Sequence, residues 1–189
     1  MAQSSTTISS QRDHKVNITG TDISFVASTK TISAVSTALA NLAVYDVITV
    51  TGTSLNNSTF TVASVATNGL SITVQETVAN ETAASFTTTI DYTGFVTNKY
   101  QGDGYYSQAD GVHTVAYHVL ATLTGAVKMQ GSLATTPTES DWFDIAGTTF
   151  TTDQSATIFS ANFTGNFVWV RAKATGVTAG SVMKILYNH

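Results

Sequence analysis

The sequence predicts an all-β protein of two small β modules after an extended N-terminal arm. The first module is expected to be barrel- or roll-like, and the second a β-sandwich or jelly roll. Apolar and polar residues alternate with a period of two in many short runs, which is typical of strands. Thr and other β-branched residues are abundant, and Gly and Asn turn signals separate the runs. These three observations predict the fold class.

The chain carries few charged residues. Asp, Glu, Lys and Arg make up 11% of the 189 residues, against roughly a quarter in average globular chains. Thr, Ser and Gly take their place. A surface with so few charges is suited to lie against other protein, and the length allows one large domain or two small ones.

Charge and hydropathy argue against nucleic-acid and membrane partners. The formal net charge is -4, and the eight Lys and Arg residues are scattered rather than gathered in the basic stripe of a nucleic-acid binder. No apolar run reaches the roughly 18 residues of a membrane span. Residues 1–7 lack the features of a secretion signal and the chain has no Cys. We therefore expect folding in a cytoplasm, without disulfides or zinc–thiolate sites.

Residues 1–20 are polar and lack a sustained period, which is typical of a segment without structure of its own. We expect an arm that tethers the chain in an assembly. The alternative is a strand added to the chain's own domain.

Residues 21–92 have the pattern of a small β barrel or roll. Asn68-Gly69 is the strongest hairpin signal, because both central residues of a type I′ turn need a positive φ. Residues 34–43 alone have helical spacing, and we expect at most one or two turns of helix there. The alternating runs lie near residues 23–27, 47–50, 60–64, 70–74 and 86–90.

Residues 93–112 are expected to link the two modules. Gly residues punctuate this segment, and bulky aromatic residues stud it. Flexible linkers are usually Gly- and Ser-rich without large rings. We therefore expect these rings to dock on a surface and fix the two modules. The aromatic residues are Phe95, Tyr100, Tyr105 and Tyr106.

Residues 113–189 resume the strand pattern and predict the sandwich or jelly roll. The only proline, Pro137, lies in a polar loop over residues 134–141. Strands are expected near residues 113–120, 127–133, 156–163, 167–173 and 182–187.

The run over residues 167–173 predicts a strand with two unlike faces. Its core face is expected to carry Val168, Val170 and Ala172. The opposite face begins aromatic and ends cationic, so we expect a loop or a neighbouring chain to cover it. On that face Arg171 and Lys173 are expected to stack on rings or pair with an acid, and Trp169 is expected to help close the core.

Several motifs resemble the C-terminal module of virion structural proteins of tailed phages, especially T4-like phages of marine bacteria, the cyanophage type. They are Asp110–Val115, Gln130–Leu133, Asp141–Phe143 and Phe163–Ala172. The first half is similar to another small β module of phage structural proteins, through Ile23–Phe25, Asp46–Gly52, Phe60–Val62 and Leu70–Val74. The resemblance implies a virion component and no enzyme site.

The candidate metal sites have simpler explanations. His113 and His118 are expected on opposite faces of one strand, where they cannot share a metal ion. Asp103-Gly104 and Asp110-Gly111 fit loops that bind calcium, but Asp-Gly is also an ordinary turn pair. We expect no metal and no cofactor.

Asp141 and Asp144 flank Trp142-Phe143, an arrangement that a glycosidase or sugar-binding cleft could use. The chain offers no second cluster of carboxylates, no nucleophile elbow and no phosphate-binding loop. We therefore expect no enzyme activity and no catalytic residues.

The expected function is that of a capsid decoration or cement protein located in the virion. Its partners would be the major capsid protein or other virion proteins, and further copies of itself, as a trimer. The alternative is a tail, baseplate or fibre component whose C-terminal module binds a host glycan. Aromatic residues and Arg dominate interface energetics, so the candidate interface residues are Phe95, Tyr100, Tyr105, Tyr106, Trp142, Trp169 and Arg171.

Overall fold

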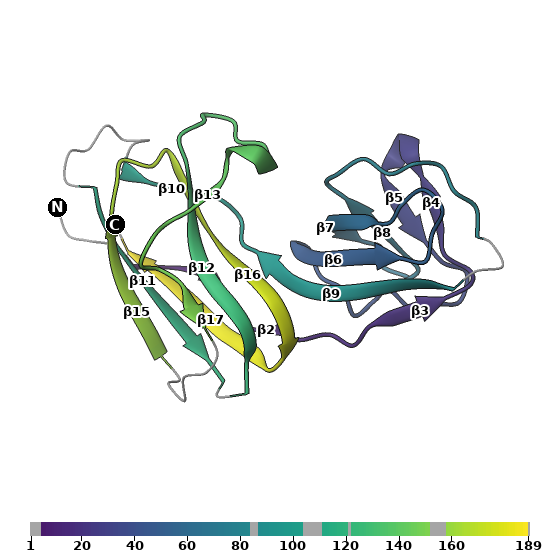
Figure 1. Cartoon of the computed structure of the whole chain (residues 1–189), viewed down its shortest axis with the longest axis horizontal. Coiled ribbons are helices and arrows are strands. Elements are labelled where there is room, and N and C mark those ends of the chain that lie inside the picture. Colours follow the sequence, from purple (N-terminus) through teal and green to yellow (C-terminus); the bar gives the residue numbers. More distant parts are fainter. Residues whose placement is uncertain (1–4, 84–86, 104–110, 121, 152–157, 189) are drawn as a thin grey trace. The chain divides into compact units, whose positions relative to one another are not determined.

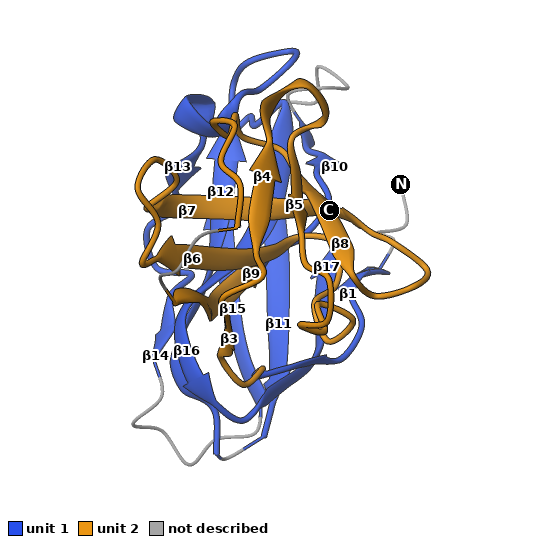
Figure 2. Cartoon of the chain, turned by 90° about the vertical axis from the view of Figure 1, so that its right-hand side faces the viewer, with its two compact units in different colours: residues 1–14, 96–189 blue, residues 15–95 orange. Residues whose placement is uncertain are grey.

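The computed structural model describes residues 5–83, 87–103, 111–120, 122–151 and 158–188. It confirms the all-β class, since these residues form no α-helix. Short 3₁₀ turns include η1 (Ala27–Thr29) and η3 (Glu139–Asp141). No helix in the described part of the chain has the length and apolar character to cross a membrane. The chain forms two compact units, residues 1–14 with 96–189 (unit 1) and residues 15–95 (unit 2), coloured separately in Figure 2.

Unit 2 is one curled antiparallel sheet in the order β9-β6-β7-β8-β5-β4, with β3 paired to the start of β9. The first half of β7 pairs with β6 and the second half with β8, and the register shifts between Val62 and Ser64. The strands are β3 (Ile18–Gly20), β4 (Ser24–Val26), β5 (Thr31–Ser33), β6 (Asp46–Thr51), β7 (Ser58–Val65), β8 (Ser71–Val74) and β9 (Thr88–Val96).

The interior of unit 2 is apolar, and alternate residues of the strands supply it as their spacing requires. Ile48 and Val50, for example, are fully buried. Leu39 and Leu42 also lie in this core, and residues 34–43, where at most one or two turns of helix were expected, form none. The Leu39 N–H donates to the Gly69 carbonyl rather than within its own segment.

The carboxylate of Asp22 fixes the start of this segment. It accepts hydrogen bonds from the backbone N–H groups of Val35, Ser36 and Thr37. In a helix these N–H groups would have no partner within the helix, so the bonds to Asp22 anchor the segment rather than prevent a helix. They also hold the pKa of Asp22 well below its ordinary value, with the hydroxyl of Thr37 as the largest cause.

The Asn68-Gly69 hairpin is confirmed, but its expected turn type is wrong. The Ala66 N–H donates to the Ser71 carbonyl, and the Gly69 N–H donates to the Ala66 carbonyl. Only Gly69 has a positive φ, of 69°. The loop is therefore longer than a two-residue type I′ turn and needs a left-handed residue at one position only.

Unit 1 contains two antiparallel sheets (Figure 1). The first, the β11 sheet, has the order β1-β17-β11-β15, with β2 also paired to β17. In the second, the β12 sheet, β12 pairs with β16 on one side and with β13 and β14 on the other, and β10 pairs with β16. The strands are β1 (Ser5–Ser9), β2 (Arg12–Asp13), β10 (Tyr100–Gln101), β11 (Val112–Val119), β12 (Thr124–Ser132), β13 (Phe143–Asp144), β14 (Phe150–Thr151), β15 (Ile158–Thr164), β16 (Trp169–Ala179) and β17 (Ser181–Asn188).

Large side chains from both sheets fill the space between them. Tyr117 of the β11 sheet is fully buried, and its hydroxyl donates to the Thr148 carbonyl at 2.9 Å. The Thr148 hydroxyl accepts from the backbone N–H of Met129 in the β12 sheet. Phe150 and Phe159 add a ring contact between the sheets at 5.7 Å. The core is therefore that of a β-sandwich.

The N-terminal segment is a strand of unit 1, as the alternative to a free arm predicted. Residues Ser5–Ser9 form β1, whose register places Ser5 opposite Asn188. Ile8 is 4% exposed, and the Tyr100 hydroxyl lies 3.5 Å from its carbonyl oxygen. The expectation of an extended arm over residues 1–20 is wrong for these residues, because β17 satisfies their backbone groups.

The structure also moves the expected domain boundaries. The proposed linker over residues 93–112 begins inside β9 and contains β10. The Thr97 N–H donates to the Ala172 carbonyl, so this part of the chain pairs with β16 rather than running free. Tyr105 and Tyr106 lie outside the described residues.

We expect Ile8→Ala to lower the free energy of unfolding of unit 1 by about 2–4 kcal/mol, because it leaves a cavity under β1. Both Trp residues belong to unit 1, so Trp fluorescence in a urea titration reports on that unit. Val16→Ala, at a side chain that is 81% exposed, is the control. Equal midpoints for the two variants would contradict a structural role for β1.

Candidate functional site

The structure brings three of the expected interface residues together on the outer face of the β12 sheet. Register pairs Arg171 with Gln130 and Trp169 with Ser132 on neighbouring strands. Val170, between them along β16, and Ala172, which follows Arg171, are fully buried in the sandwich. The two unlike faces of this strand are therefore confirmed.

Arg171 is the centre of this outer face. It is 5% exposed, and its guanidinium makes two hydrogen bonds to the Glu139 carboxylate, at 2.6 and 2.8 Å. Its Nε donates to Oε1 of Gln130 at 2.9 Å, and the guanidinium carbon lies 4.3 Å from the centre of the Trp142 ring. The bidentate pair and the ring offset the cost of removing this charge from water. The expectation that Arg171 stacks on a ring or pairs with an acid is confirmed.

Gln130 extends the network from Arg171 to β13. Its Nε2 donates to Oδ1 of Asp144 at 2.9 Å, and Lys128 binds the other carboxylate oxygen of Asp144. The amide therefore connects a buried cation on β16 with a half-exposed carboxylate on the edge of the sheet. The sequence did not predict Glu139, Gln130 or Asp144 as partners of Arg171, because their pairing depends on the register of three strands.

Trp169 lies on the outer face rather than in the core where it was expected. Its indole N–H donates to the Thr135 carbonyl at 3.0 Å, and the Lys99 ammonium lies 4.3 Å from the centre of its ring. The reason is the phase of the strand, since Val170 and Ala172 already take the inward positions. A loop of the same unit covers this face in part, as the mixed pattern predicted.

The carboxylates around Trp142 are occupied by structural partners. The hydrogen bonds from Arg171 are the largest cause of the lowered pKa of Glu139, and the bond from Lys128 is the largest cause of that of Asp144. Asp141 caps η3 through the hydroxyl and N–H of Thr138, which lower its pKa. These groups are ionised and bound at neutral pH, whereas a glycosidase needs one carboxyl with a raised pKa beside a second carboxylate.

His113 and His118 lie on opposite sides of β11. His113 is fully buried, and its ring nitrogens contact the Tyr187 hydroxyl at 2.7 Å and the Gly165 carbonyl at 3.0 Å. Burial, followed by the charge of Asp103, raises the pKa of Tyr187. In the part of the chain that is described, no group of three or more His, Asp or Glu residues converges on a possible metal position. Each of the two Asp-Gly pairs is described only in part, because Gly104 and Asp110 lie outside the described residues.

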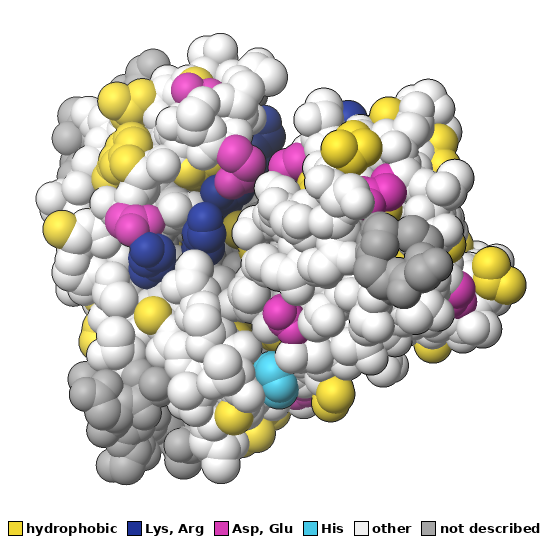
Figure 3. Space-filling model, turned by 45° about the vertical axis from the view of Figure 1, so that its right-hand side comes forward, with side chains coloured by type: hydrophobic (Ala, Val, Ile, Leu, Met, Phe, Trp, Pro, Cys, Tyr) yellow, Lys and Arg dark blue, Asp and Glu magenta, His cyan; other side chains and the backbone are white. Residues whose placement is uncertain are grey.

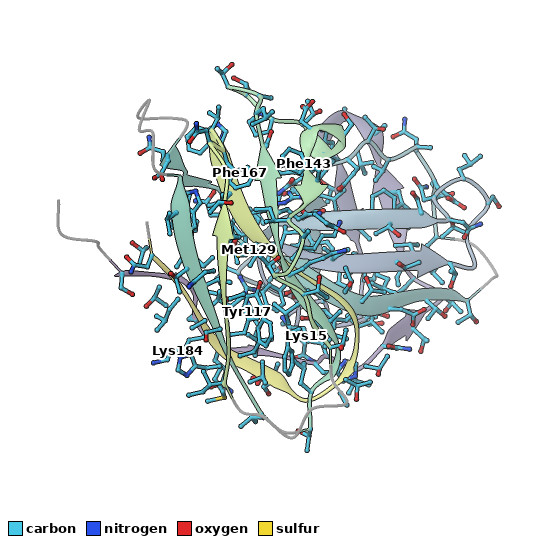
Figure 4. All side chains as sticks on the ribbon, turned by 60° about the vertical axis from the view of Figure 1, so that its left-hand side comes forward. Lys15, Tyr117, Met129, Phe143, Phe167 and Lys184 are labelled. Carbon is cyan, nitrogen blue, oxygen red and sulfur yellow. The ribbon has the colours of Figure 1, made fainter. Side chains whose placement is uncertain are left out.

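A shallow groove opens beside this face, between the edge strands β13 and β15. Its volume is about 440 Å³, within the usual range of ligand sites. The ring of Phe143, which is 44% exposed, supplies its apolar part, above the buried rings of Phe163 and Phe167. Asp144, Asn162 and Thr164 line it with polar groups. Figure 4 shows Phe143 and Phe167 at the same end of unit 1, and their ring centres are 6.0 Å apart.

Two glycines leave the space that the Phe167 ring occupies. A Cβ atom on Gly131 would lie 2.6 Å from the Phe167 ring, and one on Gly165 would lie 2.4 Å from it. Gly165 also has a φ of 154°, which side chains rarely adopt. Phe143, Phe163 and Phe167 were not expected as site residues. The glycine inside the strand at Gly131 was the available signal, because such glycines often mark a close approach.

Of the remaining expected interface residues, the structure describes Phe95 and Tyr100. Phe95 is 1% exposed at the end of β9 in unit 2. Tyr100 lies in β10, opposite Val170. Tyr105 and Tyr106 lie outside the described residues, so their expected roles stay predictions.

Comparison of the chain with protein-family models and with curated proteins finds no match. What the outer face and the groove can bind is therefore argued from their own residues.

We expect Glu139→Gln to lower the free energy of unfolding of unit 1 by about 1 kcal/mol, because a neutral amide leaves the buried guanidinium of Arg171 without its counter-charge. The effect is modest because the Glu139 side chain is 45% exposed. Trp fluorescence in urea measures it, with Glu76→Gln in unit 2 as the control. An unchanged midpoint for Glu139→Gln would contradict the role given to this ion pair.

The same pair predicts a dependence on pH. The pKa of Glu139 is lowered from 4.5 in the folded chain, so its contribution is complete above pH 4.5 and is lost as the pH falls through the folded value. We expect the difference in unfolding free energy between the wild type and Glu139→Gln to be constant from pH 7 to 5 and to shrink below 4.5. If the difference in unfolding free energy between the two proteins increased on acidification, the predicted direction of the pH dependence would be wrong.

Proposed function

We propose that the chain is a non-enzymatic structural protein of a phage virion that decorates the capsid. In this role it stabilises the head by binding the major capsid protein. The resemblance in sequence motifs motivates the virion, and the low charged fraction of 11% fits a surface that lies against protein. Figure 3 shows how sparse charged side chains are on the face that it draws.

The observation that carries the proposal is a groove with one exposed aromatic ring beside a charged cluster that is already neutralised. Phe143 is exposed at the groove, while Glu139 and Asp144 next to it bind Arg171 and Lys128 of the same unit. Interfaces have cores depleted in unpaired charge and enriched in aromatic side chains. This combination supports a protein contact rather than catalysis.

A second candidate function is that of a tail or fibre component that binds a host glycan. The groove favours it, because Asp144 and Asn162 line it together with the Phe rings. Carboxylate and amide groups hydrogen-bond hydroxyls, and exposed rings cover the apolar faces of ligands. A glycan array probed with the full chain separates the two functions. Saturable binding that Phe143→Ser abolishes supports the second function, and no binding on any glycan removes it.

We expect particles assembled without this chain to lose infectivity at a lower temperature, and in low salt, than particles that contain it. The physical reason is that many weak contacts repeated over a lattice add up. Adding the purified chain back restores resistance if it binds the finished shell. Equal resistance of the two kinds of particle would contradict a cementing role.

A further inference from the structure

We propose that the free edge of β15 accepts a β-strand from a partner protein, and that an apolar side chain of this strand enters the Phe143–Phe167 groove. The partner segment is extended, and it carries uncharged apolar residues at alternate positions. That the partner belongs to the virion rests on the proposed function, whereas the chemistry of the edge does not.

The first argument is the pairing of β15. Within the described residues this strand pairs with β11 alone and ends the β11 sheet. The pairing runs from Val112 opposite Thr164 to His118 opposite Ile158 without a register shift. In an antiparallel pair every second residue directs its N–H and C=O away from the partner strand. The outer edge of β15 therefore offers a regular row of donors and acceptors.

The second argument is that β15 lacks the features that protect edge strands. Its seven residues, Ile158–Thr164, contain no charged residue, no Pro and no Gly. Proteins commonly blunt such edges with charges, Pro or bulges. The opposite edge of the same sheet has such features, since the register of β1 shifts between Thr7 and Ser9, and β2 consists of Arg12 and Asp13. β15 is thus the edge open to another strand.

The third argument is the position of the groove. Residues Asn162–Thr164 line one side of it, and Phe143 and Ile145 line the other. β15 ends the β11 sheet and β13 pairs with β12 in the β12 sheet, so the groove lies where the sandwich is open between two strand edges. A strand added to β15 directs alternate side chains toward the space between the sheets. One of these side chains reaches the exposed ring of Phe143.

The chemistry of the groove selects the anchor. The groove exposes the Phe143 ring beside polar groups of Asn162 and Thr164, and the Asp144 carboxylate that lines it is neutralised by Lys128. An uncharged side chain that packs on the Phe143 ring is therefore favoured over a charged one. β15 of a second copy does not supply this anchor, because Phe159 and Phe163 contact Tyr117 and His113 of their own sandwich, with ring centres 5.8 and 5.0 Å apart. The occupant is a segment of a different protein, added in the manner of β-augmentation.

The test uses the full chain and a displayed library of random nine-residue peptides. We expect enriched peptides to carry apolar residues at alternate positions. A synthetic selected peptide is then titrated by fluorescence anisotropy. Phe143→Ser removes the anchor site, and Ser160→Pro removes a backbone donor. The Gly165 N–H donates to the Gly111 carbonyl, on the β11 side. Because N–H directions alternate along a strand, the N–H of Ser160, five residues earlier, points to the open edge.

We expect each of these two variants to weaken peptide binding by at least about tenfold, as loss of a central interface contact does. Leu133→Ser, at a side chain that is 65% exposed and outside the groove, is the matched control and leaves binding unchanged. Trp fluorescence checks that every variant is folded. If Ser160→Pro does not fold, Phe143→Ser decides the outcome.

Three results would overturn the proposal. They are a library without enriched peptides, enriched peptides that bind Phe143→Ser as well as the wild type, and a dimer of the chain that Ser160→Pro dissociates. The last result would assign the edge to a second copy. The two proposals can fail separately. If the peptide binds as expected, but particles with and without the chain resist heat and low salt equally, the proposed function is wrong and the assignment of the β15 edge stands.

Discussion

The outer face of unit 1 depends on the burial of one guanidinium group. Arg171 lies on β16 with 5% of its surface exposed, and an unpaired cation at such a position costs several kcal/mol, of order 3–5. Glu139, Gln130 and Trp142 satisfy it from three directions. Two of these residues, Glu139 and Trp142, come from the segment that returns the chain from β12 to β13. Folding this segment onto the sheet is therefore the condition for burying Arg171.

The same condition shapes the groove. Trp142 stacks on Arg171, and the next residue, Phe143, begins β13 opposite Gly131. Gly131 in turn leaves room for the Phe167 ring. The buried cation, the loop and the glycine thus place two rings beside β15. A single electrostatic constraint on one strand determines what the open side of the sandwich offers to a partner.

Local patterns predicted the strands and the two faces of β16, because alternation and turn residues act over a few neighbours. They could not predict contacts that depend on register or on distant segments. β1 was expected to be part of an arm because its partner β17 lies at the other end of the chain. Residues 34–43 have helical spacing, but the Leu39 N–H donates to the Gly69 carbonyl, thirty residues along the chain, instead of within a helix. Trp169 was expected in the core. It directly precedes the inward-facing Val170 on β16, so its side chain points to the other face of the sheet.

The central proposal is that this chain is a binding component of a virion and that the groove at Phe143 meets another protein. The most direct measurement is the copy number of the chain in purified particles, determined by quantitative mass spectrometry against the major capsid protein. The account predicts a fixed ratio to the capsid protein, at the level of a shell component. Absence from the particles, or an amount matching tail components only, would contradict it.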